Sequence, residues 1–197
     1  MKILKEQFAN PQGNLGKLSG LLMQIKDKNQ SSWVVANSKV KPKSSVLEVG
    51  FGPGLGIESA SGFAFEGFVA GIDISDIMLQ TATKRNSEKI RQGKVELLKG
   101  DVMEIPFEDY YFDLVFSVNS IQYWEDVQES LREIKRVLKD NGEIAIAMHP
   151  YWLETEADCI QLREKITKEV QAAGFKNVKA NLLYLKPVTA FCIYGLK

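Results

Sequence analysis

The chain has 197 residues, 45% of them hydrophobic and 25% charged, which is typical of one globular domain with a buried core. Its 25 basic and 25 acidic residues cancel, which argues against a chain-wide surface for binding nucleic acid or a membrane. The two cysteines, Cys159 and Cys192, match no metal-ligand or redox spacing, so we expect reduced thiols, no metal and a cytoplasmic protein.

Residues 1–40 precede the first strand-like run and carry apolar residues at helical spacing. We expect them to form a helical lid on a core of residues 41–197, so that residues 1–197 make one domain. The same apolar stripe also suits plain packing on the core or a shallow membrane contact. The chain has no apolar stretch of signal-peptide type at its start and no run long enough to span a bilayer.

Short apolar runs then alternate with helical patterns, and near-continuous apolar runs of this length predict strands buried on both faces. The strand-like runs are 45–50, 67–73, 95–101, 112–119 and 142–148. Between them, residues 75–92 begin with Ser75 as an N-cap candidate, and residues 125–142 end in Asn141-Gly142. Strand–helix alternation predicts a parallel, doubly wound sheet with right-handed crossovers.

The C-terminal part departs from this alternation. A helix is expected from about Thr155 to Ala173, and two strand-like runs, 175–186 and 188–197, follow with only Pro187 between them. A connection this short requires antiparallel pairing. We therefore predict an α/β, doubly wound Rossmann-like sheet of seven strands, mostly parallel, with a C-terminal antiparallel hairpin and helices on both faces.

The stretch "SSVLEVGFGPGLG", residues 44–56, places a glycine loop after the first strand, where α/β sheets bind ligands. Four features oppose a phosphate ligand. No Lys-Ser/Thr pair follows the glycines, and Leu55 stands where a dinucleotide motif has its third glycine. Pro53 removes an N–H donor, and Glu48 adds a carboxylate nearby. The loop therefore suits a cationic ligand, although a tight turn without any ligand remains the alternative.

S-adenosylmethionine, with its amine and sulfonium, is such a ligand. The run "VLEVGFGPGLG" resembles motif I, E/D-x-G-x-G-x-G, of the class I S-adenosylmethionine-dependent methyltransferases. The resemblance implies that the cofactor binds at Glu48, Gly50, Gly52 and Gly54.

Asp73 ends the second strand-like run, the place where an acidic residue binds ribose hydroxyls in sheets of this topology. Its alternative role is that of an acidic residue favoured at a helix N-terminus. The resemblance implies that Ile74 packs on the adenine and that Met78 does likewise, whereas a Met at helical spacing is also typical of a core.

Further segments resemble the same family up to about residue 148. "PFEDYYFDLVFS" is similar to its P-F-x-D-x-x-F-D-x-V run, and "RVLKDNG" to its R-V-L-K-x-G-G element with Asn141 in place of a glycine. The resemblance implies that Asp101 accepts the adenine amino group, that the Val102 N–H binds the ring, and that Asn119 lies beside the methionine part. The alternative for Asp101 is an exposed turn residue.

Methyl transfer from a sulfonium by direct displacement needs alignment more than a catalytic group. Where a base is needed, His149, which follows the fifth strand, and Tyr123 are the candidates. His149 is equally suited to a turn before Pro150. Tyr123 belongs to a group of aromatic residues with Trp124, Tyr151 and Trp152 that suits either an acceptor pocket or packing at the rim.

The resemblance is closest to small-molecule enzymes, including the ubiquinone and menaquinone biosynthesis branch. "NSIQYW" stands where nucleic-acid amino-methylating enzymes have Asp/Asn-Pro-Pro-Tyr/Phe, so we expect no nucleic-acid substrate. We therefore predict transfer of a methyl group from S-adenosylmethionine to a small apolar or aromatic molecule. The alternatives are a quinone or lipid methyltransferase at a membrane surface, a non-catalytic cofactor-binding protein and, last, a nicotinamide oxidoreductase.

Overall fold

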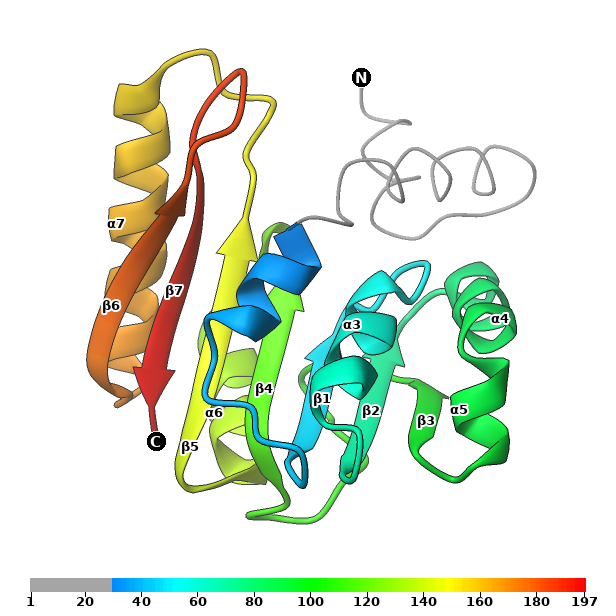
Figure 1. Cartoon of the computed structure of the whole chain (residues 1–197). Helices are drawn as coiled ribbons and strands as arrows, with labels where there is room; N and C mark the ends of the chain where they lie inside the picture. Colours follow the sequence, from blue (N-terminus) through cyan, green and yellow to red (C-terminus); the bar gives the residue numbers. More distant parts are fainter. Residues whose placement is uncertain (1–29) are drawn as a thin grey trace.

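The structure, a computed structural model, describes residues 30–197 (Figure 1). Residues 30–36 are helical. The helices that follow are α3 (Leu55–Phe63), α4 (Asp76–Arg85), α5 (Ser87–Arg91), a 3-10 turn (Ile121–Tyr123), α6 (Val127–Val137) and α7 (Glu156–Ala172). The strands are β1 (Ser45–Val49), β2 (Phe68–Asp73), β3 (Val95–Lys99), β4 (Phe112–Val118), β5 (Leu138–Met148), β6 (Lys176–Leu183) and β7 (Ala190–Leu196).

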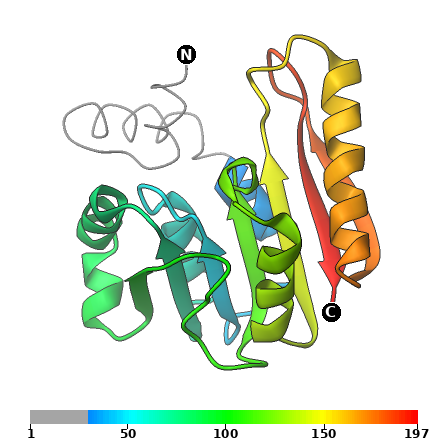
Figure 2. The ribbon, with the colours of Figure 1, turned by 180° about the vertical axis from the view of Figure 1, so that it is seen from behind.

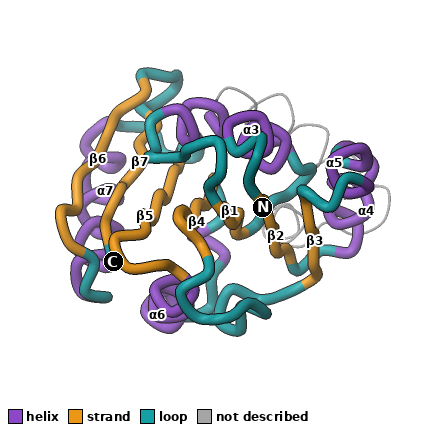
Figure 3. The backbone as a smooth tube through the Cα atoms, turned by 60° about the horizontal axis from the view of Figure 1, so that its bottom comes forward, coloured by secondary structure: helices purple, strands orange, loops and turns teal. Residues whose placement is uncertain are grey.

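The strands form one seven-stranded sheet in the order β3-β2-β1-β4-β5-β7-β6 (Figure 3). Neighbours from β3 to β5 pair in parallel, because helical or long connections carry the chain back across the sheet. β7 pairs antiparallel with both β5 and β6, and the β6–β7 pairing is the one that their short connection requires. The predicted fold, including the C-terminal hairpin, is confirmed.

Helices cover both faces of the sheet (Figures 1 and 2). Leu131 and Ile134 of α6 share a core cluster with Val170 of α7 on one face. On the other face, Ile57 of α3 packs in a second cluster with Val34 of the helical segment 30–36. The central strands are therefore buried on both sides, which is why their sequences are nearly continuous in apolar residues.

The helix predicted over 75–92 is two helices, and this is a correction. Ser75 is the N-cap, and its Oγ accepts a hydrogen bond from the Met78 N–H at 3.4 Å. The helix then breaks at Asn86, which is 3% exposed. The Asn86 Nδ2 donates to the carbonyl oxygens of Ala82 at 3.0 Å and Gly54 at 3.1 Å. A buried contact with a distant loop therefore ends α4, and no signal for it lies within the helical pattern.

The fifth strand begins earlier than predicted. β5 follows α6 directly at Leu138, and the pair Phe112↔Leu138 extends its ladder with β4. Asn141 has φ 60°, the left-handed conformation expected for the residue that replaces a glycine in this turn.

Residues 1–29 of the predicted lid lie outside the described residues. Of the remainder, Val34 and Val35 are buried in the core, and the Lys39 N–H donates to the Glu143 Oε2 at 2.8 Å. Residues 30–40 therefore attach to the sheet through apolar packing and several long-range hydrogen bonds. Within residues 30–197, no helix is both long enough and apolar enough to cross a bilayer.

Candidate functional site

The glycine loop leaves β1 at the carboxyl edge of the sheet and leads into α3. Gly50, Gly52 and Gly54 have φ angles of 71°, 50° and 81°, a region that glycine adopts without a steric penalty. The Gly50 N–H donates to the Ile72 carbonyl at 2.8 Å, which fixes the start of the loop against the end of β2. The predicted loop thus has the backbone conformation that its glycines permit.

Space lies above the loop at its centre. A Cβ at Gly52 would have no heavy atom within 4 Å, whereas a Cβ at Gly54 would lie 2.7 Å from the Asn86 Nδ2. Gly54 is therefore required by its close packing against Asn86, whereas Gly52 borders open space. An elongated ligand can approach the backbone at Gly52, so the loop fits the cofactor that the sequence predicts.

Glu48 lies below the loop. Its side chain is 2% exposed, and a Cβ at Gly56 would lie 2.0 Å from its Oε1. The carboxylate therefore packs against the first turn of α3, where the helix dipole favours a negative charge. Its attraction for a cationic cofactor stays a prediction.

Asp73 ends β2 beside the loop and is 9% exposed. Its Oδ2 accepts from the Gly52 N–H at 2.8 Å and its Oδ1 from the Ser75 N–H at 2.9 Å. Burial raises the pKa of Asp73, and these two backbone hydrogen bonds partly oppose that shift. A carboxylate has about four lone-pair sites, so the group retains capacity for ligand hydroxyls.

The next two predicted cofactor contacts, Ile74 and Met78, differ in their exposure to solvent. Ile74 is 41% exposed beside Asp73 and is available to a ligand. Met78 is 2% exposed and belongs to the core cluster that contains Ala82. Met78 therefore packs in the core, and its contact with adenine stays a prediction.

After β3, Asp101 is exposed and Val102 is 7% exposed in the core. The Asp101 Oδ1 accepts from the Met103 N–H at 2.8 Å, so this side chain orders its own turn. Both residues lie at the same sheet edge as Asp73, because parallel strands end on one side. Their contacts with adenine stay predictions.

Asn119 follows β4 with φ 54° and links three segments. Its Nδ2 donates to the Gln30 Oε1 at 3.0 Å, and its Oδ1 accepts from the His149 N–H at 2.8 Å. Its own N–H donates to the Ala147 carbonyl at 2.9 Å. Asn119 thus joins the ends of β4 and β5 to the helical segment 30–36.

His149, a candidate base, lies at this edge after β5. Its Nε2 is 3.1 Å from the Val188 carbonyl oxygen, which can only accept, so Nε2 carries the proton in this contact. A neutral His149 ring would then accept a proton at Nδ1. Tyr123, the other candidate, is half-buried in the turn after β4, and its N–H donates to the Ser120 carbonyl at 2.9 Å.

Sequence reasoning missed Ser120, which connects the ends of β1 and β4. Its Oγ donates to the Val49 carbonyl at 3.2 Å and accepts from the Trp124 Nε1 at 3.1 Å. A Cβ at Gly50 would lie 2.6 Å from the Ser120 Cβ, so that glycine is needed for this close approach. Only the adjacency of β1 and β4 indicates the contact, and no local motif does.

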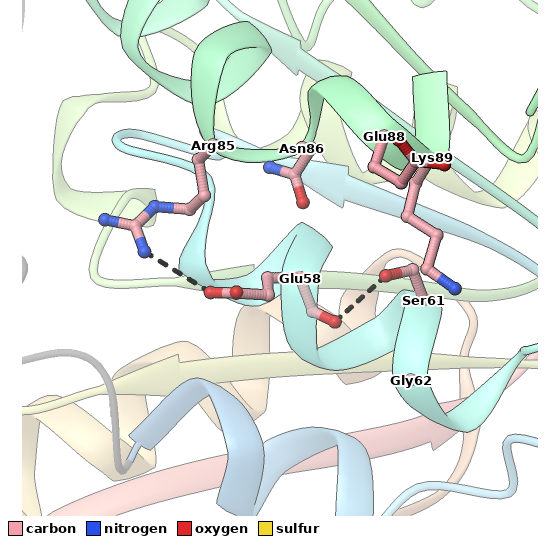
Figure 4. Close-up of a pocket in the computed structure, with 7 residues that line it drawn as sticks. All are labelled: Glu58, Ser61, Gly62, Arg85, Asn86, Glu88 and Lys89. Atoms are coloured by element: carbon pink, nitrogen blue, oxygen red, sulfur yellow. Dashed lines mark hydrogen bonds and ion pairs between the residues drawn. The ribbon is translucent and has the colours of Figure 1, made fainter. Parts of the chain in front are cut away.

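Sequence reasoning also missed the residues that hold the loop from α4. The Arg85 Nε donates to the Pro53 carbonyl at 2.9 Å, and Asn86 holds the Gly54 carbonyl. Both residues line a cavity of about 230 Å³ between α3 and the α4–α5 region, in which Arg85 pairs with Glu58 at 3.3 Å (Figure 4). None of the predicted cofactor residues lines this cavity, so it is separate from the carboxyl-edge site.

Known proteins resemble the chain in sequence and in fold. A family model described as "Methyltransferase domain" matches residues 47–146. The uncharacterized methyltransferase YdaC of Bacillus subtilis (strain 168) is 28% identical over 185 residues, covering 91% of this chain and 98% of that protein. A 2-methyl-6-phytyl-1,4-hydroquinone methyltransferase 1, chloroplastic, of Oryza sativa subsp. japonica is 33% identical over 134 residues, covering 62% of this chain.

The chain spans 41% of the length of the rice enzyme. A SAM dependent methyltransferase from Aquifex aeolicus has the same fold, with a TM-score of 0.68 at 21% identity. That match covers 88% of this chain and 92% of the other.

Proposed function

The chain belongs to the S-adenosylmethionine-dependent methyltransferases, and from this premise we propose that it methylates a small apolar or aromatic molecule by direct displacement. The observation that carries the proposal is the 2.8 Å hydrogen bond from the Gly52 N–H to the Asp73 Oδ2. It joins the glycine loop to the acid of β2 at one edge of the sheet. A ligand with a cationic centre and a ribose would meet both features together.

This geometry supports a set of residues that would hold the cofactor. The open side of Gly52 admits the ligand to the backbone, and Asp73 has remaining lone pairs for the ribose hydroxyls. The exposed Ile74 offers an apolar surface for the adenine, and Asp101 and Val102 lie at the next strand end. Asn119 lies at the end of β4, where the methionine part would be placed.

S-adenosylmethionine supplies an electrophilic methyl group on a positively charged sulfur. The chain's own residues have to align the acceptor with that methyl group and exclude water. Where the acceptor is a hydroxyl or a carbon acid, we propose that His149 takes its proton at Nδ1, because Nε2 donates to the Val188 carbonyl.

The test of the proposed function is binding and turnover with the full chain. Calorimetry should give affinities tighter than millimolar for S-adenosylmethionine and S-adenosylhomocysteine. Mass spectrometry of an acceptor panel of phenols, hydroquinones and amines should show one added methyl group on a member of the panel. Weaker cofactor binding would contradict the proposal. Tight binding without methylation in a broad metabolite screen would favour a non-catalytic cofactor-binding protein.

The role of His149 has its own test. His149→Asn should lower kcat on a hydroxyl acceptor by roughly 10²- to 10⁴-fold, the usual range for loss of a general base, and leave cofactor affinity unchanged. Tyr123→Phe is the matched variant for the other candidate. An unchanged kcat in both variants would assign proton removal to neither residue.

A second candidate is hydroquinone methylation at a membrane surface. The rice relative, a 2-methyl-6-phytyl-1,4-hydroquinone methyltransferase, supports the acceptor class. The exposed rings of Tyr151 and Trp152, 5.4 Å apart after β5, support an apolar contact near the site. The full chain should then co-sediment with anionic phospholipid vesicles, and Trp152→Ser should weaken that binding. Failure of both the full chain and a variant lacking residues 1–29 to bind vesicles would exclude this candidate.

A further inference from the structure

Two glutamine side chains flank Asn119 at the end of β4. Gln30, from the helical segment 30–36, is 2% exposed, and its Oε1 accepts from the Asn119 Nδ2 at 3.0 Å. Gln122, from the turn after β4, donates through its Nε2 to the Asn119 carbonyl at 2.7 Å. Segments 89 residues apart in sequence therefore bring two amides to one strand end.

Backbone groups determine which way each amide faces. The His149 N–H can only donate, so the atom of Asn119 that it contacts is the oxygen. The Asn119 nitrogen must then donate to Gln30, which turns the Gln30 oxygen toward Asn119. The Asn119 carbonyl can only accept, so Gln122 contacts it with its nitrogen.

One donor and one acceptor are left over. Within residues 30–197, the Gln30 Nε2 and the Gln122 Oε1 are buried and have no hydrogen-bond partner. A buried polar atom without a partner costs its full desolvation penalty, so such atoms indicate a ligand or another role. Here the two atoms have complementary chemistry: one donates and the other accepts.

The position of the pair indicates its ligand. In the order β3-β2-β1-β4, the proposed adenine and ribose positions fall at β3 and β2, and the glycine loop follows β1. Strands are spaced by about 4.8 Å, so a ligand lying across these strand ends reaches β4 after roughly 14 Å. The part of the cofactor beyond the sulfur is an α-amino acid, which presents one anionic acceptor and one cationic donor.

We propose that the Gln30 Nε2 donates to the α-carboxylate of the cofactor and that the Gln122 Oε1 accepts from its α-ammonium group. This inference rests on the proposed function. Asn119 is then a positioning residue that orients both amides, and the two glutamines are the groups that contact the cofactor. The pair would make the site select ligands that carry an intact amino-acid end.

The test compares S-adenosylhomocysteine with 5′-methylthioadenosine, which has the same adenosine and sulfur but lacks the amino acid. Calorimetry on the full chain should show that Gln30→Met and Gln122→Met each weaken S-adenosylhomocysteine binding by roughly 10-fold or more, as expected for a hydrogen bond to a charged group. Binding of 5′-methylthioadenosine should change by less than about 2-fold in both variants. Gln92→Met, at an exposed glutamine of the α5 end, is the matched control and should change neither affinity.

Analogues without one of the two charged groups assign each contact. The affinity for the decarboxylated analogue should not change in Gln30→Met, and the affinity for the deaminated analogue should not change in Gln122→Met. In each case the analogue already lacks the group that the substituted glutamine would contact. The wild-type chain should bind both analogues more weakly than S-adenosylhomocysteine. This comparison does not need a variant, so it remains valid where a variant fails to fold.

Other outcomes overturn the inference. Equal losses for S-adenosylhomocysteine and 5′-methylthioadenosine would mean a structural role, and unchanged affinities would mean no contact. A raised acceptor KM with unchanged S-adenosylhomocysteine affinity would assign the pair to the methyl acceptor. Failure of the wild-type chain to bind either adenosine ligand would contradict the proposed function itself.

Discussion

Asp73 shows how a single side chain can hold a loop and still keep lone pairs for a ligand. Its two carboxylate oxygens each accept a backbone N–H, from Gly52 and from Ser75. These bonds use two of about four lone-pair sites and hold the carboxylate at the end of β2. The same burial that positions the group also raises its pKa.

The raised pKa of Asp73 predicts pH-dependent cofactor binding. In the proposed contact, ribose hydroxyls would donate to the ionised carboxylate, so affinity should be full above the raised pKa of Asp73 and should fall as the pH drops through it. Asp73→Asn should weaken S-adenosylhomocysteine binding at neutral pH by roughly 10- to 100-fold and remove this pH dependence. Calorimetry across the acidic range checks both effects.

The contribution of Asp73 to the free energy of unfolding should change with pH in the opposite direction from cofactor affinity. Because the pKa of Asp73 is raised on folding, the folded chain binds more protons than the unfolded chain between the two pKa values. Its contribution to the free energy of unfolding therefore decreases as pH rises through that window. The free energies of unfolding of the wild type and of Asp73→Asn, measured with urea, should converge at low pH. A gap that is constant with pH would contradict the assignment.

At the scale of the element, α3 contains two glycines with different requirements. Gly56 faces the buried Glu48 carboxylate, and a Cβ there would lie 2.0 Å from the Glu48 Oε1. Gly62, near the other end of the same helix, would present a Cβ with nothing within 4 Å. Gly56 is required by the close approach of the Glu48 carboxylate, whereas Gly62 has no such contact and only lowers the helix propensity.

Alanine at these two positions should therefore have opposite effects. Gly56→Ala overpacks a buried site and should lower the free energy of unfolding by about 1–3 kcal/mol. Gly62→Ala should raise it by about 0.5–1 kcal/mol, because Ala loses less backbone entropy in a helix. Urea melts of both variants give the comparison, and a stabilising Gly56→Ala would show that Glu48 can move aside.

The break between α4 and α5 is a second feature at this scale. Asn86→Asp removes the donor that holds the Gly54 and Ala82 carbonyls and adds a charge beside them. We expect a loss of about 1–3 kcal/mol in the free energy of unfolding. The exposed Asn37, which donates to the Trp33 carbonyl at 2.8 Å, gives the matched control Asn37→Asp, with a change within about 0.5 kcal/mol. Equal effects of the two substitutions would contradict a special role for Asn86.

At the scale of the whole molecule, the hairpin strand β7 reports on opening of the sheet. Cys192 is fully buried on β7, where it pairs with Ala147 of β5 and Asn181 of β6. Burial raises the pKa of the Cys192 thiol, so it is protonated and protected at neutral pH. Reaction with a thiol reagent should therefore require opening of the fold.

Ligand binding should slow that reaction if the sheet opens as one unit. In the Cys159→Ser variant, where Cys192 is the remaining thiol, S-adenosylhomocysteine at 100 times its Kd should slow labelling by about 100-fold. The rate of thiol modification at neutral pH is the measurement. A rate that does not respond to the ligand would mean that β6 and β7 open separately from the cofactor edge.

Much of this architecture is determined by local sequence. The apolar runs that became β1 to β4 end within about two residues of their predicted positions, because a strand buried on both faces needs apolar residues along its length. Asn141 and Gly174 adopt the left-handed conformation where the pattern places a helix end or turn. The glycines after β1 and the acid at the end of β2 likewise lie at the sheet edge where the sequence predicts the ligand.

The tertiary structure decided which of these features meet. Asn86 ends α4 because it contacts the Gly54 carbonyl 32 residues away, and Gln30 meets Asn119 across 89 residues. Ser120 touches Gly50 because β4 lies beside β1 in the sheet. Propensity and periodicity act over about a dozen residues, whereas these contacts depend on strand order. The sequence by itself therefore determined most of the elements and the cofactor class, and only the folded sheet ended α4 at Asn86 and brought the two glutamines to the end of β4.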